Sequence, residues 1–559
     1  MKKVLPVLFL VLIVAAGFWL LIRGGPYVET EVAVTEITET PDSEHGYRKA
    51  PAVTSLLATL YGQMDSASPE PMPDPGEGSA GPEADAGDGI IIPGEYVLRF
   101  HTRADQEAFM RVVRELGYEV LGRMSFGNAL RIRVPDEDAL RRLLGMAPAP
   151  RDHDHNYFVR TPDPKRAPQR SAEQGYVGLG DALLAWLGAG VDNANWGRGV
   201  TIAVLDTAVS SHPGIPESRI RRLGKSGMTT EGAKGDHGTA IASLIIGDPA
   251  HAAGIAPAAS VLSIPIITGE GSGNTFALAE AVIDAVSMGS DIINMSLGTY
   301  GNSALLKAAI GHALHNQVAV VAATGNDAQN MVTYPARYKG VIGVGAVDAN
   351  GRPLYFSNHG PQVDVAAPGY GVRAAGRDGA ILQTTGTSIA TPLVSGAIAA
   401  ILSEGRNLRP VEAARILVDY SDDRGVPGED IAVGEGVISV QRALDRDTSG
   451  IYNMTAAPAF TIAEGEGAER MTVYLYAQNR GTEPLDTVTL NVDVNGEQQV
   501  LTYDNVGVGD SVIHEFVITT NVLAGFDSIT ITHSVGIPGQ TDSVPGDNAR
   551  ETVMTYKGK

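Results

Sequence analysis

VTIAVLDTA, at residues 200–208, is the stretch that indicates the fold class. Its first six residues are apolar or β-branched without a break, which predicts a strand buried on both faces, as in a parallel sheet. The run ends at Asp206, and the carboxyl ends of such strands are where α/β active sites form. One acid at this position is a weak indication of function by itself, so the motifs that follow it decide its meaning.

His237 lies in the sequence DHGTA at residues 236–240, ahead of an apolar stretch with several small residues. This pattern predicts a helix that begins at His237 and packs closely against its neighbours. Histidine is the side chain suited to general base catalysis near neutral pH. A single histidine is more often structural, but the motif around this one favours a functional role.

Ser388 lies in GTSIATP at residues 386–392, and a helical pattern rich in small residues follows it. The glycine permits a tight turn before the helix. Backbone N–H groups at a helix N-terminus attract negative charge, which a tetrahedral oxyanion carries. A serine hydroxyl is a weak nucleophile unless a base, itself oriented by an acid, lies next to it.

Asn326 follows the predicted strand VAVVAA at residues 318–323, in the sequence TGND. Its side-chain amide can donate a hydrogen bond at the end of that strand. The alternative interpretation is an asparagine that only forms a turn. Each motif alone is a modest signal, but the four occur together in the order Asp, His, Asn, Ser.

This order, together with stretches such as GIAPAASV (254–261) and NMSLG (294–298), resembles the subtilisin-like serine peptidases of the S8 family. The resemblance extends over about residues 180–445. It implies an α/β fold, with a three-layer α/β/α catalytic domain and a mainly parallel sheet. We expect this domain at residues 176–446.

By this resemblance, Asp206 orients His237, and His237 takes the proton of Ser388. Ser388 then attacks the scissile carbonyl and forms an acyl-enzyme. Asn326 and the backbone N–H of Ser388 stabilise the oxyanion. The chain is therefore expected to be an exported serine endopeptidase that acts on peptide or protein substrates.

The family binds its substrate as an added strand between two backbone segments. By the resemblance, these segments are formed by Gly271, Ser272 and Gly273 and by Ser296, Leu297 and Gly298. One wall of the pocket for the residue before the scissile bond is formed by Ala323, Thr324 and Gly325. None of these residues is charged, so we expect a small or apolar side chain at that substrate position.

Where many relatives carry a calcium-binding insertion, this chain has only GDPAHAA at residues 247–253. No metal site is assigned and no cofactor is certain, although acidic loops elsewhere leave calcium open as a cofactor. Thr207-Ala208 replaces the usual small turn after Asp206, and Ile389 replaces a frequent Met. Neither departure removes a catalytic group.

Residues 91–160 predict a small α+β module of the ferredoxin-like type. The expected strands and helices are Glu95–Phe100, Ala104–Tyr118, Ala129–Val134 and Asp136–Leu144. Residues 91–170 contain 14 Lys and Arg against 11 Asp and Glu, a charge of +3 beside −25 for the rest of the chain. Opposite charge favours association with the acidic body, and the resemblance implies an inhibitory propeptide. An ordinary domain without a ligand is the alternative.

The stretch from Pro148 to Gln174 is rich in Pro, Arg and Asp, which is typical of an exposed cleavage region. We expect the chain to cut itself between residues 151 and 176. The sequence DHDH at residues 152–155 offers metal ligands, but a solvated tail is the simpler interpretation.

Residues 1–23 combine Lys2 and Lys3 with a run of 19 uncharged residues that ends before Arg23. About 20 apolar residues span a bilayer as a helix, so this segment predicts a signal anchor that contacts the membrane. A cleaved signal peptide is the alternative, and both predict export. Residues 24–90 predict an acidic linker rich in Pro and Gly, because such a composition buries too little apolar surface to fold.

Residues 450–559 predict an all-β, immunoglobulin-like sandwich. Runs such as MTVYLYAQN (471–479) and TVTLNVDVN (487–495) alternate like strands, and Gly, Asn, Asp and Pro turns separate them. The pattern resembles a cell-adhesion-related bacterial (CARDB-type) domain. It carries no catalytic set, so structural support and surface or substrate binding both remain open as its role.

Composition supports this division. The chain has 559 residues, 43% of them hydrophobic, a formal net charge of −22 and no cysteine. Such acidity argues against nucleic-acid binding, and the lack of cysteine excludes disulfides and a thiolate nucleophile. Two rival functions stay open: a catalytically silent peptide-binding or adhesion protein on a peptidase scaffold, and a membrane-bound processing protease with few substrates.

Overall fold

The computed structural model describes a defined part of the chain. The described residues are 89–162, 176–180, 193–224, 236–268, 271–404, 407–425, 428–457, 459–464, 470–519 and 528–555. The expectations for residues 1–23, for the linker up to residue 88 and for the cleavage region at 163–175 lie outside them. In these described ranges, no helix has the length and apolarity needed to cross a membrane.

A seven-stranded parallel sheet forms the centre of the catalytic domain, in the order β12-β11-β10-β9-β5-β7-β6. Its strands are β5 (Thr201–Asp206), β6 (Ile220–Arg222), β7 (Ser260–Pro265), β9 (Ile292–Met295), β10 (Ala319–Ala323), β11 (Ile342–Val347) and β12 (Val365–Pro368). The buried strand predicted from VTIAVL is therefore β5, a central strand. Its apolar run fits a position with protein on both faces.

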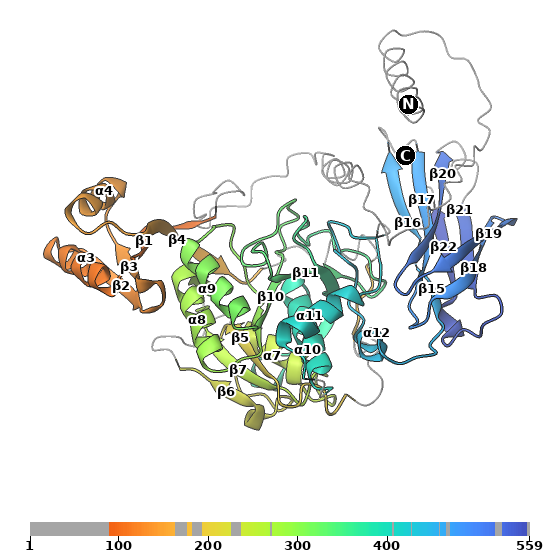
Figure 1. Ribbon diagram of the computed structural model, residues 1–559, viewed down its shortest axis with the longest axis horizontal. Helices are drawn as coiled ribbons and strands as arrows, with labels where there is room; N and C mark the ends of the chain where they lie inside the picture. The colour runs from red at the N-terminus through yellow and green to blue at the C-terminus, as the bar shows by residue number, and fades with distance from the viewer. Residues whose placement is uncertain are drawn as a thin grey trace, which may run out of the picture. The chain divides into compact units, whose positions relative to one another are not determined.

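Helices cover both faces of this sheet and give three layers (Figure 1). Alternation along β5 divides the core, because Ile202 and Val204 face one layer whereas Ala203 and Leu205 face the other. The first layer contains α7 (His237–Ile246), α10 (Thr387–Leu402), α11 (Pro410–Asp419) and α12 (Val440–Asp445), and the second contains α8 (Thr275–Ser287) and α9 (Ala304–His315). The α/β/α arrangement expected from the sequence is confirmed.

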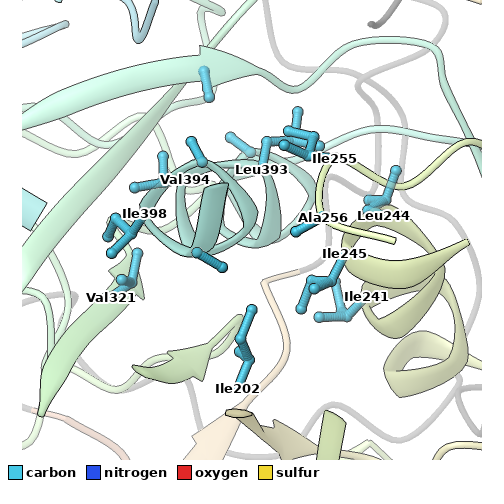
Figure 2. Close-up of a cluster of buried hydrophobic side chains, with 14 of the residues drawn as sticks. Ile202, Ile241, Leu244, Ile245, Ile255, Ala256, Val321, Leu393, Val394 and Ile398 are labelled. Carbon is cyan, nitrogen blue, oxygen red and sulfur yellow. The ribbon is translucent and has the colours of Figure 1, made fainter. Parts of the chain in front are cut away.

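The core under the first layer brings together the two helices that begin at His237 and Thr387. Side chains of α7, α10, β5 and β10 belong to one apolar cluster, in which Ile398 of α10 lies beside Val321 of β10 (Figure 2). Small residues on both helices allow this close approach. The core therefore fixes two helix starts beside the carboxyl ends of the strands.

The N-terminal module has the order βαββαβ and an antiparallel sheet in the order β2-β3-β1-β4. Its elements are β1 (Ile91–Arg99), α3 (Arg103–Glu115), β2 (Glu119–Met124), β3 (Ala129–Arg133), α4 (Glu137–Met146) and β4 (Asp152–Arg160). The two helices and two of the strands lie where the sequence predicted them. Strands β2 and β4 escaped prediction because their polar residues break the alternating pattern.

Strand β4 corrects the expectation of a solvated tail at residues 152–155. Asp152 accepts hydrogen bonds from Arg99 at 2.5 and 2.6 Å, and the ring of His155 lies 4.9 Å from that of Tyr96. Pairing with β1 and a further strand, β8 (Ser272–Asn274), decides the conformation of this stretch. These partners lie far away in sequence, so local composition gave no sign of them.

The C-terminal domain contains two antiparallel sheets around one apolar core. One sheet has β17 between β15 and β16 on one edge and β20 on the other, and the second has the order β19-β18-β21-β22. The strands are β15 (Met454–Ala456), β16 (Phe460–Glu464), β17 (Arg470–Asn479), β18 (Leu485–Val494), β19 (Glu497–Val506), β20 (Ser511–Thr519), β21 (Ser528–Gly536) and β22 (Ala549–Thr555). The strands predicted at 471–479 and 487–495 correspond to β17 and β18.

Candidate active site

Asp206 ends β5 as predicted, and its side chain is fully buried. Its Oδ1 accepts a hydrogen bond from the backbone N–H of Thr207 at 2.6 Å. The turn that follows is tied to the next motif, because Thr207 Oγ1 accepts from the N–H of Gly238 at 2.7 Å. A Cβ on Gly238 would lie 2.2 Å from the Thr207 carbonyl oxygen, which explains the glycine.

His237 begins α7, and its ring meets the Asp206 carboxylate. Nδ1 lies 2.9 Å from both Oδ1 and Oδ2 of Asp206. This contact favours a proton on Nδ1 and leaves Nε2 as the basic nitrogen. Within the described part of the chain, Nε2 is buried and makes no hydrogen bond. A base held by a buried acid is the arrangement that activates a hydroxyl.

Ser388 is the second residue of α10, and 2% of it is exposed. The helix N-cap, Gly386, has φ 143°, a conformation that side chains rarely adopt. A Cβ there would lie 3.2 Å from Ser388 Oγ and 2.8 Å from Asn326 Nδ2. The serine hydroxyl and the asparagine amide therefore border the same small space.

Asn326 has one half of its amide fixed and the other half without a partner. Its Oδ1 accepts hydrogen bonds from the N–H and the hydroxyl of Thr387, both at 2.9 Å. Its Nδ2 is buried and makes no hydrogen bond to any described residue. A buried donor of this kind is rare in folded proteins unless it serves a ligand or a reaction. An N–H₂ group beside the first turn of a helix is the kind of donor that can stabilise a developing negative charge.

Thr387 was not singled out from the sequence, although GTSIATP contains it. Its role appears only when Asn326 and α10 come together, so no local signal identifies it. Asn358 is a second such residue. Its Oδ1 accepts from the N–H groups of Asp327 and Gln329, both at 3.0 Å, and thereby holds the loop that carries Asn326.

The predicted wall of the substrate pocket follows β10. The Thr324 hydroxyl donates to the Val344 carbonyl at 3.2 Å, and Gly325 N–H contacts Thr387 Oγ1 at 3.3 Å. Gly325 has no room for a side chain, because Asn358 Nδ2 would lie 2.4 Å from its Cβ. Ala323, the last residue of β10, is fully buried. The three residues therefore lie beside the Ser388 turn.

The two predicted substrate-binding segments hold a strand of this same chain. In β8, Gly273 pairs with Val159 and Ser272 with Arg160, antiparallel to β4. Opposite them, Arg160 N–H donates to the Gly298 carbonyl at 3.1 Å, and Gly298 N–H donates to the Arg160 carbonyl at 2.9 Å. The end of β4 therefore lies between both segments as a middle strand.

The remaining residues of these two segments lie in the same part of the molecule. Gly271 makes the turn before β8, with its N–H donating to the Thr268 carbonyl at 2.8 Å. Leu297 is fully buried in the apolar core. Ser296 connects its segment to the serine, because its hydroxyl donates to the Ser388 carbonyl at 2.8 Å. The predicted binding residues and Ser388 therefore form one continuous site.

Side chains of β4 also cap two helices of the catalytic domain. Asp154 Oδ2 accepts from Ala304 N–H at 2.8 Å, at the first residue of α9. Asn156 Oδ1 accepts from Thr275 Oγ1 at 3.0 Å and Phe276 N–H at 3.2 Å, at the start of α8. Side-chain oxygens at these positions satisfy N–H groups that have no partner in the helix.

Glu95 supports this arrangement from inside the module. Its side chain is 2% exposed and receives hydrogen bonds from Arg131, Arg133 and Asn156 at 2.8 Å. Burial by itself would raise the pKa of Glu95, but these hydrogen bonds outweigh it and lower the pKa. The charged carboxylate therefore orients the amide of Asn156 toward α8.

Among the residues placed by the structure, no three or more His, Asp or Glu side chains are grouped so that they could hold a metal ion. The short segment at 247–253 follows α7 directly and returns through Gly254, whose N–H donates to the Gly247 carbonyl at 2.9 Å.

Comparison with known proteins adds the family. Residues 197–436 match the model of the subtilase family, peptidase S8. The thermostable alkaline protease of Halalkalibacterium halodurans is 36% identical over 213 residues, 37% of this chain and 58% of the relative. Subtilisin Savinase of Lederbergia lenta is 31% identical over 249 residues, 44% of this chain and 91% of the relative.

Two solved structures are also similar. The prenylagaramide maturation protease PagA is 30% identical, with 47% of this chain and 98% of that chain covered and a TM-score of 0.42. The patellamide maturation protease PatA is 31% identical, with 44% and 96% covered and a TM-score of 0.41. From the extent of the match to subtilisin Savinase, we conclude that the chain belongs to the subtilase family and that its catalytic domain is of the subtilisin-like serine endopeptidase class.

Proposed function

We propose that this chain is an exported serine endopeptidase that hydrolyses peptide bonds through an acyl-enzyme and is made as a zymogen that processes itself. Asp206, His237 and Ser388 form its catalytic triad. The observation that carries the proposal is the pair of buried nitrogens without partners, His237 Nε2 and Asn326 Nδ2, at a site where the chain's own strand β4 lies as substrate would.

The reaction begins with proton transfer. Asp206 holds the Nδ1 proton of His237, so Nε2 is free to take the proton of the Ser388 hydroxyl as it attacks the scissile carbonyl carbon. The imidazolium that forms is stabilised by the buried carboxylate at 2.9 Å. His237 then donates that proton to the leaving amine, and a water molecule repeats the sequence to release the acyl group.

Charge on the carbonyl oxygen is stabilised by donors that are fixed in advance. Thr387 holds Oδ1 of Asn326 by two hydrogen bonds, which leaves the Nδ2 protons for the oxyanion. The Ser388 N–H in the first turn of α10 is the second donor. Because these donors need no reorganisation, they stabilise the transition state more than the substrate.

Residues 91–160 act as an inhibitory propeptide of ferredoxin-like fold. Three contacts support this proposal: the strand pairing of β4 in the substrate site and the caps from Asp154 and Asn156. A peptide that fills the site blocks other substrates. These contacts use strand pairing and helix capping, so the module does not depend on its net positive charge alone.

The register of β4 indicates where the chain is cut. Arg160 lies opposite Gly298, so the antiparallel direction carries the next residues toward Ser296. Pro162 comes opposite Ser296, whose hydroxyl contacts Ser388. We therefore place the cleavage within one residue of Pro162, inside the interval of residues 151–176 expected from the sequence.

The other assignments remain part of the proposal. The two-sheet C-terminal domain is immunoglobulin-like: β15, β16, β17 and β20 form one sheet and β18, β19, β21 and β22 the other, which is the division expected of that sandwich. Residues 1–23 direct export and anchor the protein to the membrane. The uncharged pocket wall favours a small or apolar residue before the scissile bond.

Expression of the Ser388→Ala chain tests the proposal. Purified alone, this variant should remain a precursor, whereas wild-type protein should yield a mature N-terminus close to residue 163. A fluorophosphonate should label mature wild-type protein on Ser388 and leave the variant unlabelled. Processing of the purified variant would exclude self-cleavage, and the absence of labelling in mature wild-type protein would exclude the serine peptidase.

A further inference from the structure

The C-terminal domain contacts the catalytic domain through the segment that follows α11, at residues 421–437, described at 421–425 and 428–437. Arg480 Nη1 lies 2.9 Å from Asp422 Oδ2. The N–H of Asp423 donates to Gln478 Oε1 at 3.0 Å, and the Ser511 hydroxyl donates to Asp423 Oδ2 at 2.9 Å. Three contacts therefore hold one short stretch of the catalytic domain.

The contact between the two domains is largely buried, which makes it costly to break. The side chains of Arg480 and Asp422 are 12% and 18% exposed, and Asp423 is 5% exposed. Burial lowers the pKa of Arg480 to about 10 and raises the pKa of Asp423. A buried charge that loses its partner is strongly destabilising. The two domains are therefore held together unless both charges return to water.

From this contact, backbone hydrogen bonds lead to the turn before Ser388. Asp422 and Val437 exchange N–H to carbonyl bonds of 2.7 and 2.8 Å. The residues on either side of Val437 bond in the same way to Ala366 of β12, at 2.9 and 3.0 Å. At the end of β12, the Gly369 carbonyl accepts from the N–H of Gly386 at 2.8 Å.

A second route leads to the loop of Asn326. The Ile431 carbonyl accepts from the N–H of Gly360 at 2.8 Å. Two residues before Gly360, the side chain of Asn358 holds Asp327, and its N–H donates to the Gly325 carbonyl at 3.0 Å. The first route uses backbone atoms only, and the second adds the buried side chain of Asn358. Closely packed groups of this kind transmit a displacement instead of absorbing it.

We propose that Arg480, Gln478 and Ser511 are positioning residues for peptide hydrolysis. By holding residues 421–437, these side chains of the C-terminal domain fix the turn before Ser388 and the loop before Asn326. The C-terminal domain thus positions active-site residues through residues 421–437, without contacting substrate. This inference rests on the proposed function, because it assigns the reaction to Ser388 and Asn326.

The test uses the mature protein, which retains the catalytic and C-terminal domains, and a peptide substrate. Arg480→Met should lower kcat about tenfold or more and leave KM within twofold, because a small displacement of reacting groups slows the chemical step. Substrate pairing at 271–273 and 296–298 is not part of either route. The matched control is Arg415→Met, whose side chain is 82% exposed in an ion pair with Asp419, and it should match the wild type.

Milder variants keep the test decisive if Arg480→Met does not fold. Arg480→Lys retains the charge and should retain more activity than Arg480→Met. Ser511→Ala removes one hydrogen bond and no charge, and it should lower kcat two- to fivefold with KM unchanged. Values of kcat within the error of wild type for Ser511→Ala and Arg480→Lys, or within twofold for folded Arg480→Met, would overturn the inference.

Hydrogen exchange separates this inference from the proposed function. In the Ser388→Ala background, Arg480→Met should speed exchange about tenfold in peptides containing Gly360 and Gly386, with β5 as the unchanged reference. This readout needs no activity. A wild-type protein that hydrolyses no peptide would defeat the proposed function, whereas unchanged exchange at both glycines would defeat the positioning role.

Discussion

The N-terminal module and the C-terminal domain both contact the catalytic domain, but by different kinds of interaction. The module pairs β4 with backbone segments of the substrate site and caps α8 and α9 with single side chains. The C-terminal domain contributes Arg480 to a largely buried ion pair with Asp422. The strand pairing of the module is a contact that any extended peptide can make, whereas its two caps and the ion pair of Arg480 depend on particular side chains of this chain.

This difference indicates which attachment is temporary. Strand pairing and caps exchange readily for substrate and water, because each contact is weak and replaceable. A buried ion pair has no such substitute. We therefore expect the module to leave after one cut and the C-terminal domain to stay attached for the life of the enzyme.

The largest effect is expected for Ser388→Ala, which should prevent release of the N-terminal module from the catalytic domain. Loss of the nucleophile should lower the rate of peptide hydrolysis by about 10⁴-fold or more. The uncut module should also remain in the site. Mass spectrometry of the purified chain measures the cut, and a peptide assay measures hydrolysis. A processed Ser388→Ala chain would mean that another protease removes the module.

Asn326→Ala should slow both events by a similar factor, about 10²–10³-fold. The reason is that one oxyanion site serves the cleavage of the chain itself and the cleavage of substrate. Single-turnover processing of the precursor and kcat on a peptide give the two rates. A variant that slows only one of them would show that processing and hydrolysis use different sites.

Low pH should weaken the C-terminal domain through His533. Burial lowers the pKa of His533 to about 4 in the folded domain, against 6.5 for an exposed histidine. Below pH 6.5 the unfolded chain binds a proton that the folded domain does not, so stability falls from pH 6.5 down to about 4. The loss is about 3 kcal/mol. Calorimetry of wild type and His533→Gln measures it, and equal losses in both proteins would contradict this origin.

Asp364 lies beside residues 421–437. Its titration should lower the stability of the folded protein as the pH rises, opposite to the effect of His533. Burial raises its pKa to about 6 against 3.8 for the exposed group, although the N–H of Gly343 favours the charged form. The folded state therefore prefers the protonated acid, and stability falls by about 3 kcal/mol as the pH rises from 3.8 through 6. Asp364→Asn should remove this dependence. The measurement is urea unfolding at pH 4 and pH 7.

The smallest effect is expected at a helix cap. Asp154→Ala removes the hydrogen bond that Asp154 accepts from the first N–H of α9, whose own N-cap is Ser303. Such a bond stabilises by about 1 kcal/mol, so the module should release the site about fivefold more often. In the Ser388→Ala precursor, this appears as tighter binding of a fluorescent peptide. Asp138→Ala is the control, because its side chain is 69% exposed on the module. Equal affinity in all three precursors would show that this cap does not hold the module.

Sequence reasoning located Asp206, His237, Asn326 and Ser388 because each lies at the start or end of a regular element. Local patterns reveal such ends, and the order of the motifs connects them. The same reasoning missed β4, Thr387 and Asn358. Their partners are distant in the sequence, so nothing in their own neighbourhood distinguishes them.

By itself, the sequence determined the parallel α/β core and suggested the division of the chain and the side chains that we propose to react, since these follow from hydrophobic pattern and residue chemistry. Tertiary structure alone decided that Arg160 lies between the two predicted substrate segments, that Asn326 Nδ2 has no partner among the described residues, and that Arg480 meets Asp422. Each of these depends on the register and burial of groups far apart in the chain. Such properties exist only after the chain has folded.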